Sequence, residues 1–219
     1  MEEKVLMESP LFGGLTAEEI TTVLTSLPHM VRGYKRDQFL LHSGEPTQRF
    51  GMMLEGEAII FREDYWGNRN ILDRIVPGDI FGESYACVPG SLMRVSVESE
   101  HDCTVLWLRM HEFLEYAAHP LGVRLMQNLT ALLAEKTLAM NEKLTHLTQR
   151  SIREKALSFL TAESQRQGRE EFEIYFNRQQ LADYLSVDRS ALSAELSRMQ
   201  REGILSYHRN RFRLHRRRQ

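Results

Sequence analysis

The residues with the most informative spacing lie in the stretch 177–198, NRQQLADYLSVDRSALSAELSR. Within it, Arg189, Ser190 and Ser193 fall on one face near the start of a predicted helix. Arginine can donate two hydrogen bonds to a guanine edge and serine can donate or accept, so this face suits the major groove of DNA. An ordinary helical hairpin with a solvated polar face has the same pattern and stays open as the alternative.

Two amphipathic helices joined by a tight turn would hold this face. Asn177 with Gln180 predicts a capping box at the start of the first helix, and Asp188 predicts a cap for the second. Ser186 stands where such turns often have glycine, and Glu195 occupies a position that is usually apolar. The apolar residues expected to form the shared core recur at helical spacing: Leu181, Ala182, Leu185, Val187, Leu192 and Leu196.

A β-hairpin is predicted directly after these helices. Gly203 is expected to close the second helix, and the segments 204–207 and 211–214 alternate apolar and polar residues around His208-Arg209-Asn210. Helix, turn, helix and hairpin together predict a winged-helix domain.

Charge separates the chain into two parts. Residues 150–219 hold 15 Lys and Arg against 9 Asp and Glu, a net charge of +6, whereas residues 1–149 hold 13 against 21, a net of −8. Only the C-terminal part suits a polyanion. The arginines near the end of the chain are expected to contact DNA phosphates: Arg209, Arg211, Arg213, Arg216, Arg217 and Arg218. The alternative is that this basic tail only improves solubility.

Length and composition predict two modest globular domains, with 219 residues of which 42% are hydrophobic and 26% charged. The apolar runs are too short to span a bilayer and the acidic N-terminus lacks the features of a signal peptide, so we expect a cytoplasmic protein with no membrane partner. Cys87 and Cys103 are too few for a disulfide framework and are most simply buried thiols, with a thiol redox sensor as the alternative.

The N-terminal part alternates brief strand-like segments with Gly and Pro turns, which predicts an antiparallel jelly roll. The expected strands are 38–42, 50–54, 58–63, 71–76, 94–98 and 104–108. Between two of them lies the glycine-rich segment 78–91, GDIFGESYACVPGS. A glycine turn running into a short helix can cradle an anion, with Glu83 available for a hydroxyl and Arg94 for a negative group. A plain β-turn closing the roll is the alternative.

A long helix is predicted over 119–148. Met126, Leu133, Met140 and Leu147 fall seven residues apart, with a second series at Val123, Thr130, Thr137 and Leu144. Two apolar series indicate parallel pairing with a second copy of the chain. Leu125, Leu129, Leu132 and Ala139 form an adjoining face that is expected to pack on the roll. Ser151 with Glu154 then predicts a capping box, and a hinge, before the next helix.

Four segments together resemble the Crp-Fnr family of bacterial transcription regulators: 54–61 (LEGEAIIF), 77–84 (PGDIFGES), the long helix, and 177–205. The resemblance spans nearly the whole chain. It implies an α+β fold with an effector-binding β-roll of the cyclic-nucleotide-binding type (1–118), a dimerisation helix (119–149) and a winged helix-turn-helix domain (150–219). It also implies a homodimer on a palindromic double-stranded DNA operator, contacting RNA polymerase if it is an activator, and not an enzyme.

The resemblance assigns roles to individual residues. It implies that Arg178 contacts phosphate and that Arg189, Ser190 and Ser193 contact bases, with Arg209 and Arg211 on the wing. The dimer would be held by Met126, Leu133, Met140, Leu144 and Leu147. Where one branch of the family has Glu, Ser and Arg as its reading triplet, this chain has Ser190, Ser193 and Ala194. A different operator sequence is therefore expected.

The effector site would involve Gly82, Glu83, Ser84 and Arg94, but it departs from the cyclic-AMP pattern. Members that bind cyclic AMP have a consecutive Arg-Ser pair where this chain has Met93-Arg94. Arg94 could still be the phosphate ligand if the loop has gained one residue, but the hydroxyl partner is lost. Cyclic AMP is therefore not the expected effector, and the small molecule stays unnamed. No cysteine precedes Cys87, which excludes the N-terminal iron-sulfur cluster of the oxygen-sensing branch.

Two other functional classes stay open from the residues alone. A jelly-roll enzyme of the cupin type would need a His-x-His metal set, and the histidines of the N-terminal part lack that spacing. A ligand-binding module could instead act on a protein partner through the helix-turn-helix. We expect no bound metal and no catalytic residues.

Overall fold

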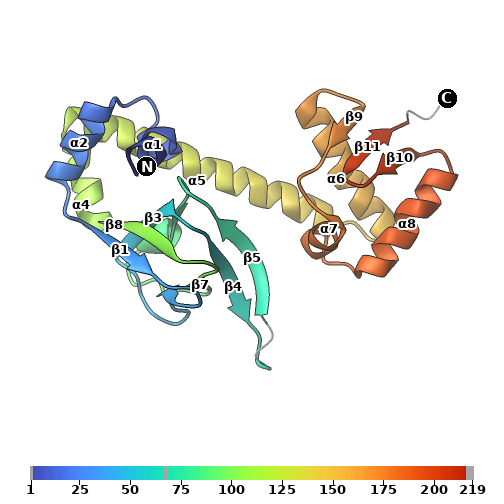
Figure 1. Cartoon of the computed structure of the whole chain (residues 1–219), viewed down its shortest axis with the longest axis horizontal. Helices are drawn as coiled ribbons and strands as arrows, with labels where there is room; N and C mark the ends of the chain where they lie inside the picture. Colours follow the sequence, from blue (N-terminus) through green and yellow to red (C-terminus); the bar gives the residue numbers. More distant parts are fainter. Residues whose placement is uncertain (1, 67–68, 216–219) are drawn as a thin grey trace. The chain divides into compact units, whose positions relative to one another are not determined.

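The computed structural model describes residues 2–66 and 69–215. The chain divides into two units, Met1–Ala134 and Glu135–Gln219, which we call the roll unit and the winged-helix unit. Their border falls inside the 28-residue helix α5 (Pro120–Leu147), close to the helix predicted over 119–148. Figure 1 follows the chain from the roll unit through α5 to the winged-helix unit.

The roll unit is built from two four-stranded antiparallel sheets, in the orders β1-β8-β3-β6 and β2-β7-β4-β5. Their strands are β1 (His29–Tyr34), β2 (Phe39–Leu41), β3 (Arg49–Glu55), β4 (Ala58–Glu63), β5 (Arg69–Ile75), β6 (Ile80–Phe81), β7 (Ser96–Ser99) and β8 (Cys103–Arg109). The six predicted strands are confirmed, with ends that move by up to two residues. Two further strands, β1 and β6, were not predicted.

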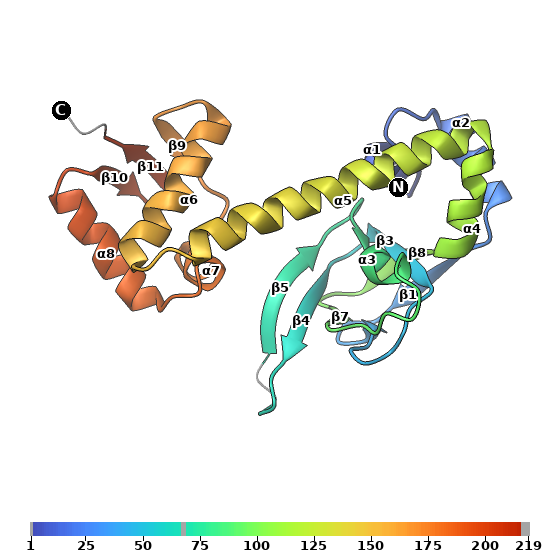
Figure 2. The same ribbon diagram turned by 180° about the vertical axis from the view of Figure 1, so that it is seen from behind.

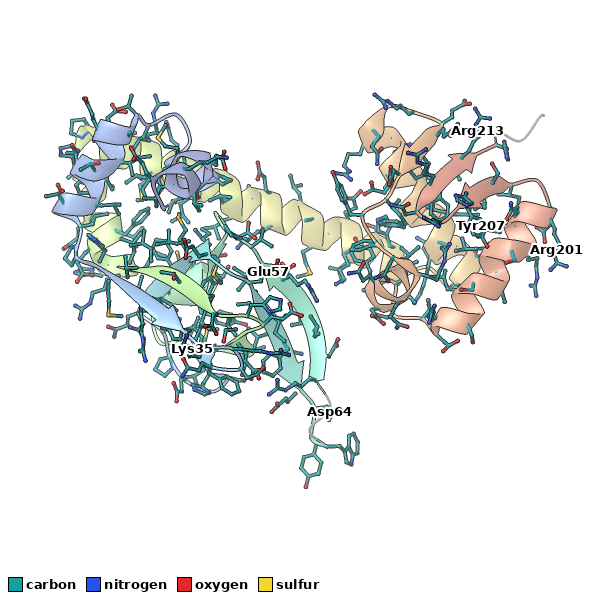
Figure 3. The ribbon with its side chains drawn as sticks, in the orientation of Figure 1. Lys35, Glu57, Asp64, Arg201, Tyr207 and Arg213 are labelled. Atoms are coloured by element: carbon teal, nitrogen blue, oxygen red, sulfur yellow. The ribbon has the colours of Figure 1, made fainter. Side chains whose placement is uncertain are left out.

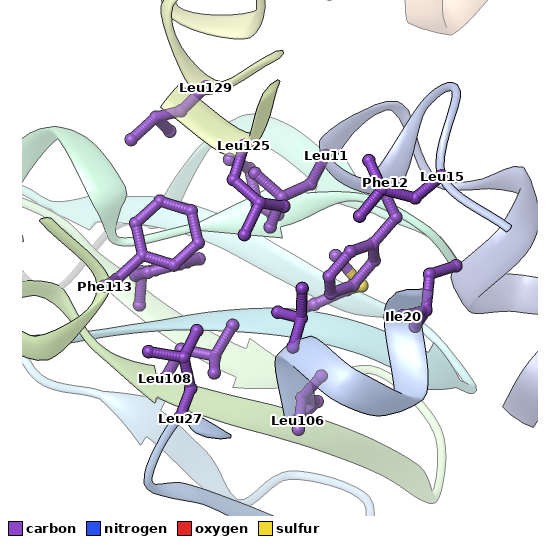
Figure 4. Close-up of a cluster of buried hydrophobic side chains, with 14 of the residues drawn as sticks. Leu11, Phe12, Leu15, Ile20, Leu27, Leu106, Leu108, Phe113, Leu125 and Leu129 are labelled. Atoms are coloured by element: carbon purple, nitrogen blue, oxygen red, sulfur yellow. The ribbon is translucent and has the colours of Figure 1, made fainter. Parts of the chain in front are cut away.

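Helices cover the outer face of the sheet that contains β3 and β8 (Figures 1 and 2). They are α1 (Glu2–Glu8), the 3-10 turn η1 (Pro10–Phe12), α2 (Ala17–Ser26), α4 (Met110–Glu115), the 3-10 turn η2 (Tyr116–Ala118) and the first half of α5. Leu106 and Leu108 of β8 meet Phe113 of α4 and Leu125 of α5 in one buried cluster (Figure 4). A second cluster fills the space between the two sheets and includes Trp107.

Helix α5 packs on the roll only along its first half. Leu125 and Leu129 are buried in the cluster of Figure 4 and Leu132 is half-buried, as predicted. Ala139 is exposed, so the expectation that it packs on the roll is wrong. The prediction extended one face over too many turns, because spacing along a helix does not reveal where the supporting sheet ends.

The winged-helix unit begins with the last turns of α5 and continues through α6 (Ile152–Gln167), β9 (Glu171–Glu173), α7 (Arg178–Tyr184), α8 (Arg189–Arg201), β10 (Leu205–His208) and β11 (Arg211–Leu214). The strands form one antiparallel sheet in the order β10-β11-β9. The helix pair and the hairpin are confirmed, whereas β9 was not predicted.

One buried cluster unites this unit. It joins Phe159 of α6 to Leu181 of α7, Leu192 and Leu196 of α8, and Phe212 of the hairpin. The start of α6 is fixed by the predicted capping box, in which the amide of Glu154 donates to Ser151 Oγ at 3.2 Å and the amide of Ser151 donates to Glu154 Oε2 at 3.0 Å. The capping box therefore fixes the residue at which α6 begins after α5 ends.

Candidate nucleic-acid interface and ligand cassette

Helix α8 begins at a cap that also orients one of its candidate contact residues. The amide of Ala191 donates to Asp188 Oδ1 at 2.8 Å, and the Ser190 hydroxyl donates to the same oxygen. The Ser190 hydroxyl, followed by the amide of Ala191, lowers the pKa of Asp188, so the cap stays ionised at neutral pH. Within the part of the chain described, exposed Arg189 has no ion-pair partner, and Ser193 is half-buried.

The turn between α7 and α8 is closed without glycine. Ser186 adopts a left-handed conformation with φ of 51°, and the amide of Val187 donates to the carbonyl of Ala182 at 3.0 Å. The capping box at Asn177 and Gln180 is formed as predicted, with the Gln180 amide 3.0 Å from Asn177 Oδ1. The short helix pair is therefore fixed at each junction by its own residues.

Arg178, the first residue of α7, lies against the hairpin. Its guanidinium carbon is 4.9 Å from the ring centre of Tyr207 and 5.5 Å from that of Phe212, and its Nη2 donates to the carbonyl of Arg209 at 3.3 Å. Burial lowers the pKa of Arg178, although the guanidinium remains charged. Tyr207 and Phe212 were not predicted as partners of Arg178, although alternation along the two hairpin strands places both rings on one face.

A hollow of about 520 Å³ lies beside Arg178. It is lined by Tyr175, Phe176, Asn177, Arg178, Gln180, Arg209 and Asn210. Arg209 occupies the hairpin turn with φ of 56° and is exposed. Two predicted phosphate contacts, Arg178 and Arg209, are thus brought together at one concave surface.

The other wing arginines have acidic neighbours. Arg211 lies 3.6 Å from Glu173 and Arg213 lies 3.3 Å from Glu171, across the β11–β9 pair (Figure 3 labels Arg213). All four side chains are exposed, so these ion pairs contribute little and can exchange for phosphate. Arg216, Arg217 and Arg218 lie outside the described residues.

Glu195 occupies its unusual position because α6 supplies a partner. Arg153 Nε lies 2.6 Å from Glu195 Oε1, and its two terminal nitrogens lie 2.8 and 2.9 Å from the carboxylate of Glu202. These two carboxylates raise the pKa of Arg153. Because Glu195 lies within α8 and Glu202 directly follows it, Arg153 ties α6 to the helix that carries Arg189.

The ligand cassette of the roll unit forms the predicted glycine turn and short helix. Gly82 has φ of 79° and precedes α3 (Glu83–Ala86), and a Cβ atom at Gly82 would lie 2.9 Å from Leu41 Cδ1. The alternative of a plain β-turn is therefore wrong. Glu83 is only 3% exposed and its Oε1 accepts from the Ser84 hydroxyl at 3.3 Å.

Met93 and Arg94, which occupy the positions of the Arg-Ser pair, lie in different surroundings. Met93 is 3% exposed and packs in the cluster between the sheets, whereas Arg94 is exposed. A buried thioether therefore stands where cyclic-AMP-binding members place a guanidinium. Arg94 can meet an anion only at the surface of the roll.

The residues of α5 that are proposed to pair with a second copy of the chain differ in how exposed they are. Met126 and Leu133 are half-buried against the roll core, and Leu147 is also half-buried. In the winged-helix unit, Met140 is 59% and Leu144 50% exposed. An apolar surface on α5 is thus left open to water in the single chain.

Neither cysteine is activated. Burial raises the pKa of Cys103 to about 11 and also raises that of Cys87, whose Sγ lies 3.6 Å from Met110 Sδ. A redox sensor needs an accessible thiolate, so these surroundings disfavour that alternative. Residues 2–66 and 69–215 contain no cluster of His, Cys, Asp and Glu suited to a metal ion. No helix among them is long and apolar enough to cross a membrane.

Two family models match the chain. Residues 31–119 match the cyclic nucleotide-binding domain, and residues 154–219 match the Crp-like helix-turn-helix domain. The first match contains the cassette and the second contains α7, α8 and the hairpin. The two matches lie in the order that the resemblance implies.

Two curated proteins are similar to parts of the chain. The cyclic AMP receptor protein of Thermus thermophilus is 30% identical over 129 residues, which are 58% of this chain and 57% of that protein. A cAMP-dependent protein kinase regulatory subunit of Mycosarcoma maydis is 35% identical over 81 residues, 37% of this chain and 15% of that one. The chain thus matches between about a seventh and three fifths of the length of these curated relatives.

A solved structure extends the likeness in fold to nearly the whole chain. The global regulator CLP of Xanthomonas campestris, described as c-di-GMP responsive, superposes with a TM-score of 0.62 at 16% identity, covering 92% of this chain and 100% of that one. The paired domain matches, the fold and the motif together show that the chain belongs to the Crp-Fnr family of transcription regulators.

Proposed function

We propose that this chain regulates transcription as a homodimer that binds a palindromic operator under the control of a small effector in the roll. The observation that carries the proposal is the start of α8, where a capped helix end presents Arg189 without an acidic partner among the described residues. A free guanidinium at that place can donate two hydrogen bonds to guanine. As a DNA-binding protein of a bacterial family, it would act in the cytoplasm.

The hydrogen bond that Ser190 already makes decides whether its hydroxyl can donate to a base or accept from one. Its single hydroxyl hydrogen is donated to Asp188, which leaves the oxygen lone pairs free. Ser190 would therefore accept a hydrogen bond from the amino group of adenine or cytosine rather than donate to guanine or thymine. Operator selection from a randomised library should favour such a base, and Ser190→Ala should remove the preference.

Phosphate contacts would set the affinity. Arg178 and Arg209 line the hollow beside the hairpin, and the arginines on β11 can exchange their exposed carboxylate partners for phosphate. Since each neutralised phosphate releases counterions, operator affinity should fall steeply with salt.

Pairing would involve α5. The exposed side chains of Met140 and Leu144, with Val123 nearer the roll, supply an apolar surface that a second copy could cover. Met126, Leu133 and Leu147, which are half-buried, would complete the seam. Two copies of α8 could then meet half-sites about one helical turn apart.

The effector would be a small molecule other than cyclic AMP, held by Gly82, Glu83, Ser84 and Arg94. Although one relative is named as a cyclic AMP receptor, this chain buries Met93 where that chemistry requires a guanidinium. An effector that favours one arrangement of the winged-helix units would need a coupling free energy of about 1 to 3 kcal/mol. Contact with RNA polymerase would follow only if the protein activates.

The proposal is tested by measuring operator affinity with Arg189→Ala and, as a charge-matched control, Arg62→Ala on the exposed end of β4. Arg189→Ala should weaken the operator complex about 10- to 100-fold and relax specificity at one base pair, whereas the control should bind normally. Equal affinities for operator and random DNA, or no dependence on salt, would contradict the proposal.

A further inference from the structure

A second concave surface of the roll unit borders the cassette at Leu41, whose side chain also faces Gly82. It is a hollow of about 470 Å³ lined by Arg32 and Tyr34 of β1, strand β2, His42 and residues 45–48 of the following loop, and two arginines at strand ends, Arg49 and Arg109. None of Gly82, Glu83, Ser84 or Arg94 lines it. The size is typical of a small-molecule site.

Strand register places all three arginines on one face of one sheet. Arg49 of β3 lies directly opposite Arg109 of β8, and Arg32 of β1 lies opposite Val105 of β8. Residues opposite each other share a face, and alternate residues of a strand share it too, so Arg32, Arg49 and Arg109 lie on the same face as Trp107. That face borders the interior of the roll, because Val105 and Trp107 are buried between the two sheets.

The guanidiniums are held by aromatic rings more than by carboxylates. The Arg49 guanidinium carbon is 4.7 Å from the ring centre of Trp107, and that of Arg32 is 4.9 Å from the ring centre of Tyr34. The indole of Trp107 donates to the Tyr34 hydroxyl at 3.0 Å in the buried interior, which fixes both rings. Such stacking orients a guanidinium while leaving its N–H groups free.

Positive charge at this hollow is poorly balanced. Arg109 pairs with Glu112 at 3.1 Å, but Arg32 and Arg49 have no carboxylate partner in the described part of the chain. Glu45 also lines the hollow and is exposed. Like charges directly opposite in an antiparallel pair, such as Arg49 and Arg109, destabilise the sheet unless an anion lies between them.

We propose that this hollow is a binding site for a small anion with two or more carboxylate or phosphate groups. Arg49 and Arg32 would each donate paired N–H groups to one anionic group, and Arg109 would neutralise the remaining charge. The site goes beyond the proposed effector cassette, because it uses another part of the roll and needs neither DNA nor a second copy of the chain.

Trp107 provides a direct measurement, because Arg49 lies over its ring. The chain has two tryptophans, and the other, Trp66, is 81% exposed near the tip of the β4–β5 hairpin, so Trp66→Phe isolates the Trp107 emission without disturbing the core. Titration of this full-length variant with citrate or with pyrophosphate should change the emission saturably, with a Kd below about 1 mM for at least one of them. The two anions distinguish carboxylate from phosphate recognition.

Sodium chloride at matched ionic strength and uncharged glycerol are the controls, and neither should saturate. Arg49→Gln and Arg32→Gln in the same background should each weaken binding about tenfold or more, because each removes charge-assisted hydrogen bonds. Arg62→Gln, on the exposed end of β4, should bind like the parent. Arg32→Gln guards against misfolding of the Arg49 variant, since Arg32 is exposed.

The proposal is overturned if neither anion saturates up to about 10 mM, or if both arginine variants bind as tightly as the parent. Binding of an acidic peptide in place of either small anion would also overturn it and assign the surface to a protein partner. Operator affinity measured on the same variants keeps the two proposals separate, because Arg49→Gln should leave DNA binding by the ligand-free protein unchanged.

Discussion

The helix pair of the winged-helix unit and the cassette of the roll unit hold their candidate residues in different ways. In the helix pair, each start is fixed by a cap within three residues, from Asn177 to Gln180 and from Asp188 to Ala191. In the cassette, the glycine turn is fixed by strands remote in sequence: Gly82 faces Leu41, and the amide of Gly78 donates to Met53. Local signals position the first region and long-range packing positions the second.

This difference affects which residues remain available for ligands. Arg189 stands free at a capped helix end, whereas Glu83 is buried and Met93 belongs to the roll core. A short motif can therefore keep its function when its surroundings change. In a cassette held by strands that are distant in sequence, the packing of those strands decides which side chains can reach a ligand.

The largest expected effect comes from the helix that both units share. Met140→Glu with Leu144→Glu places two charges on the exposed apolar surface of α5 and should produce monomers, lowering operator affinity by about 100-fold or more because bivalent binding is lost. Sedimentation velocity and gel shift give the two readouts. Asn141→Glu, a neighbouring exposed position, is the control and should leave both unchanged. A double variant that stays dimeric would refute the pairing surface.

Alanine substitutions at two glycines test how much packing by distant strands adds to the local conformational cost. Gly82 and Gly203 both have positive φ, at 79° and 71°, but a Cβ atom meets Leu41 at 2.9 Å in the first and nothing within 4 Å in the second. Gly82→Ala should therefore lower the free energy of unfolding by about 2 to 3 kcal/mol and Gly203→Ala by about 1 kcal/mol. Urea denaturation measures both, and equal losses would show that crowding at Gly82 has no cost.

Arg178 tests whether a side chain held by rings acts through charge or through shape. Arg178→Ala should weaken binding about tenfold for all DNA sequences and reduce the salt slope by about one unit, because a phosphate contact is lost. Arg178→Lys keeps the charge but loses the planar group over Tyr207 and Phe212, so it should recover the salt slope and only part of the affinity. A change confined to one base pair would contradict a phosphate role.

The smallest expected effect is a pH dependence confined to the winged-helix unit. His146 is buried against Phe159 and Tyr184 with Nδ1 2.8 Å from Ser158 Oγ, and burial lowers the pKa of His146 despite the opposing charges of Glu142 and Glu163. Below the ordinary histidine pKa of about 6.5 the unfolded chain binds more protons, so stability is lost as pH falls. The Tm of this unit should drop by a few degrees on acidification, and His146→Gln should reduce the drop. An unchanged drop would assign it to other groups.

Sequence patterns predicted the parts of this molecule that short segments determine. The caps at Ser151, Asn177 and Asp188 follow from residues three apart, and the wing follows from alternation around a short turn. Strand β1 was missed because its residues are mostly exposed and show no apolar alternation, and β9 because its only apolar residue is Phe172, between two glutamates.

The candidate sites divide along the same line. The position of Arg189 followed from its helix alone, whereas the grouping of Arg32, Arg49 and Arg109 depends on strand register. Register comes from pairing between residues far apart in the chain, and no spacing within one segment encodes it.

Arg153 has a consequence for signalling. The Arg153 guanidinium binds both Glu195 and Glu202 while its own backbone belongs to α6, so α6 and α8 are expected to move together. A change in the direction of α6 at Ser151 would therefore reorient α8 by the same amount.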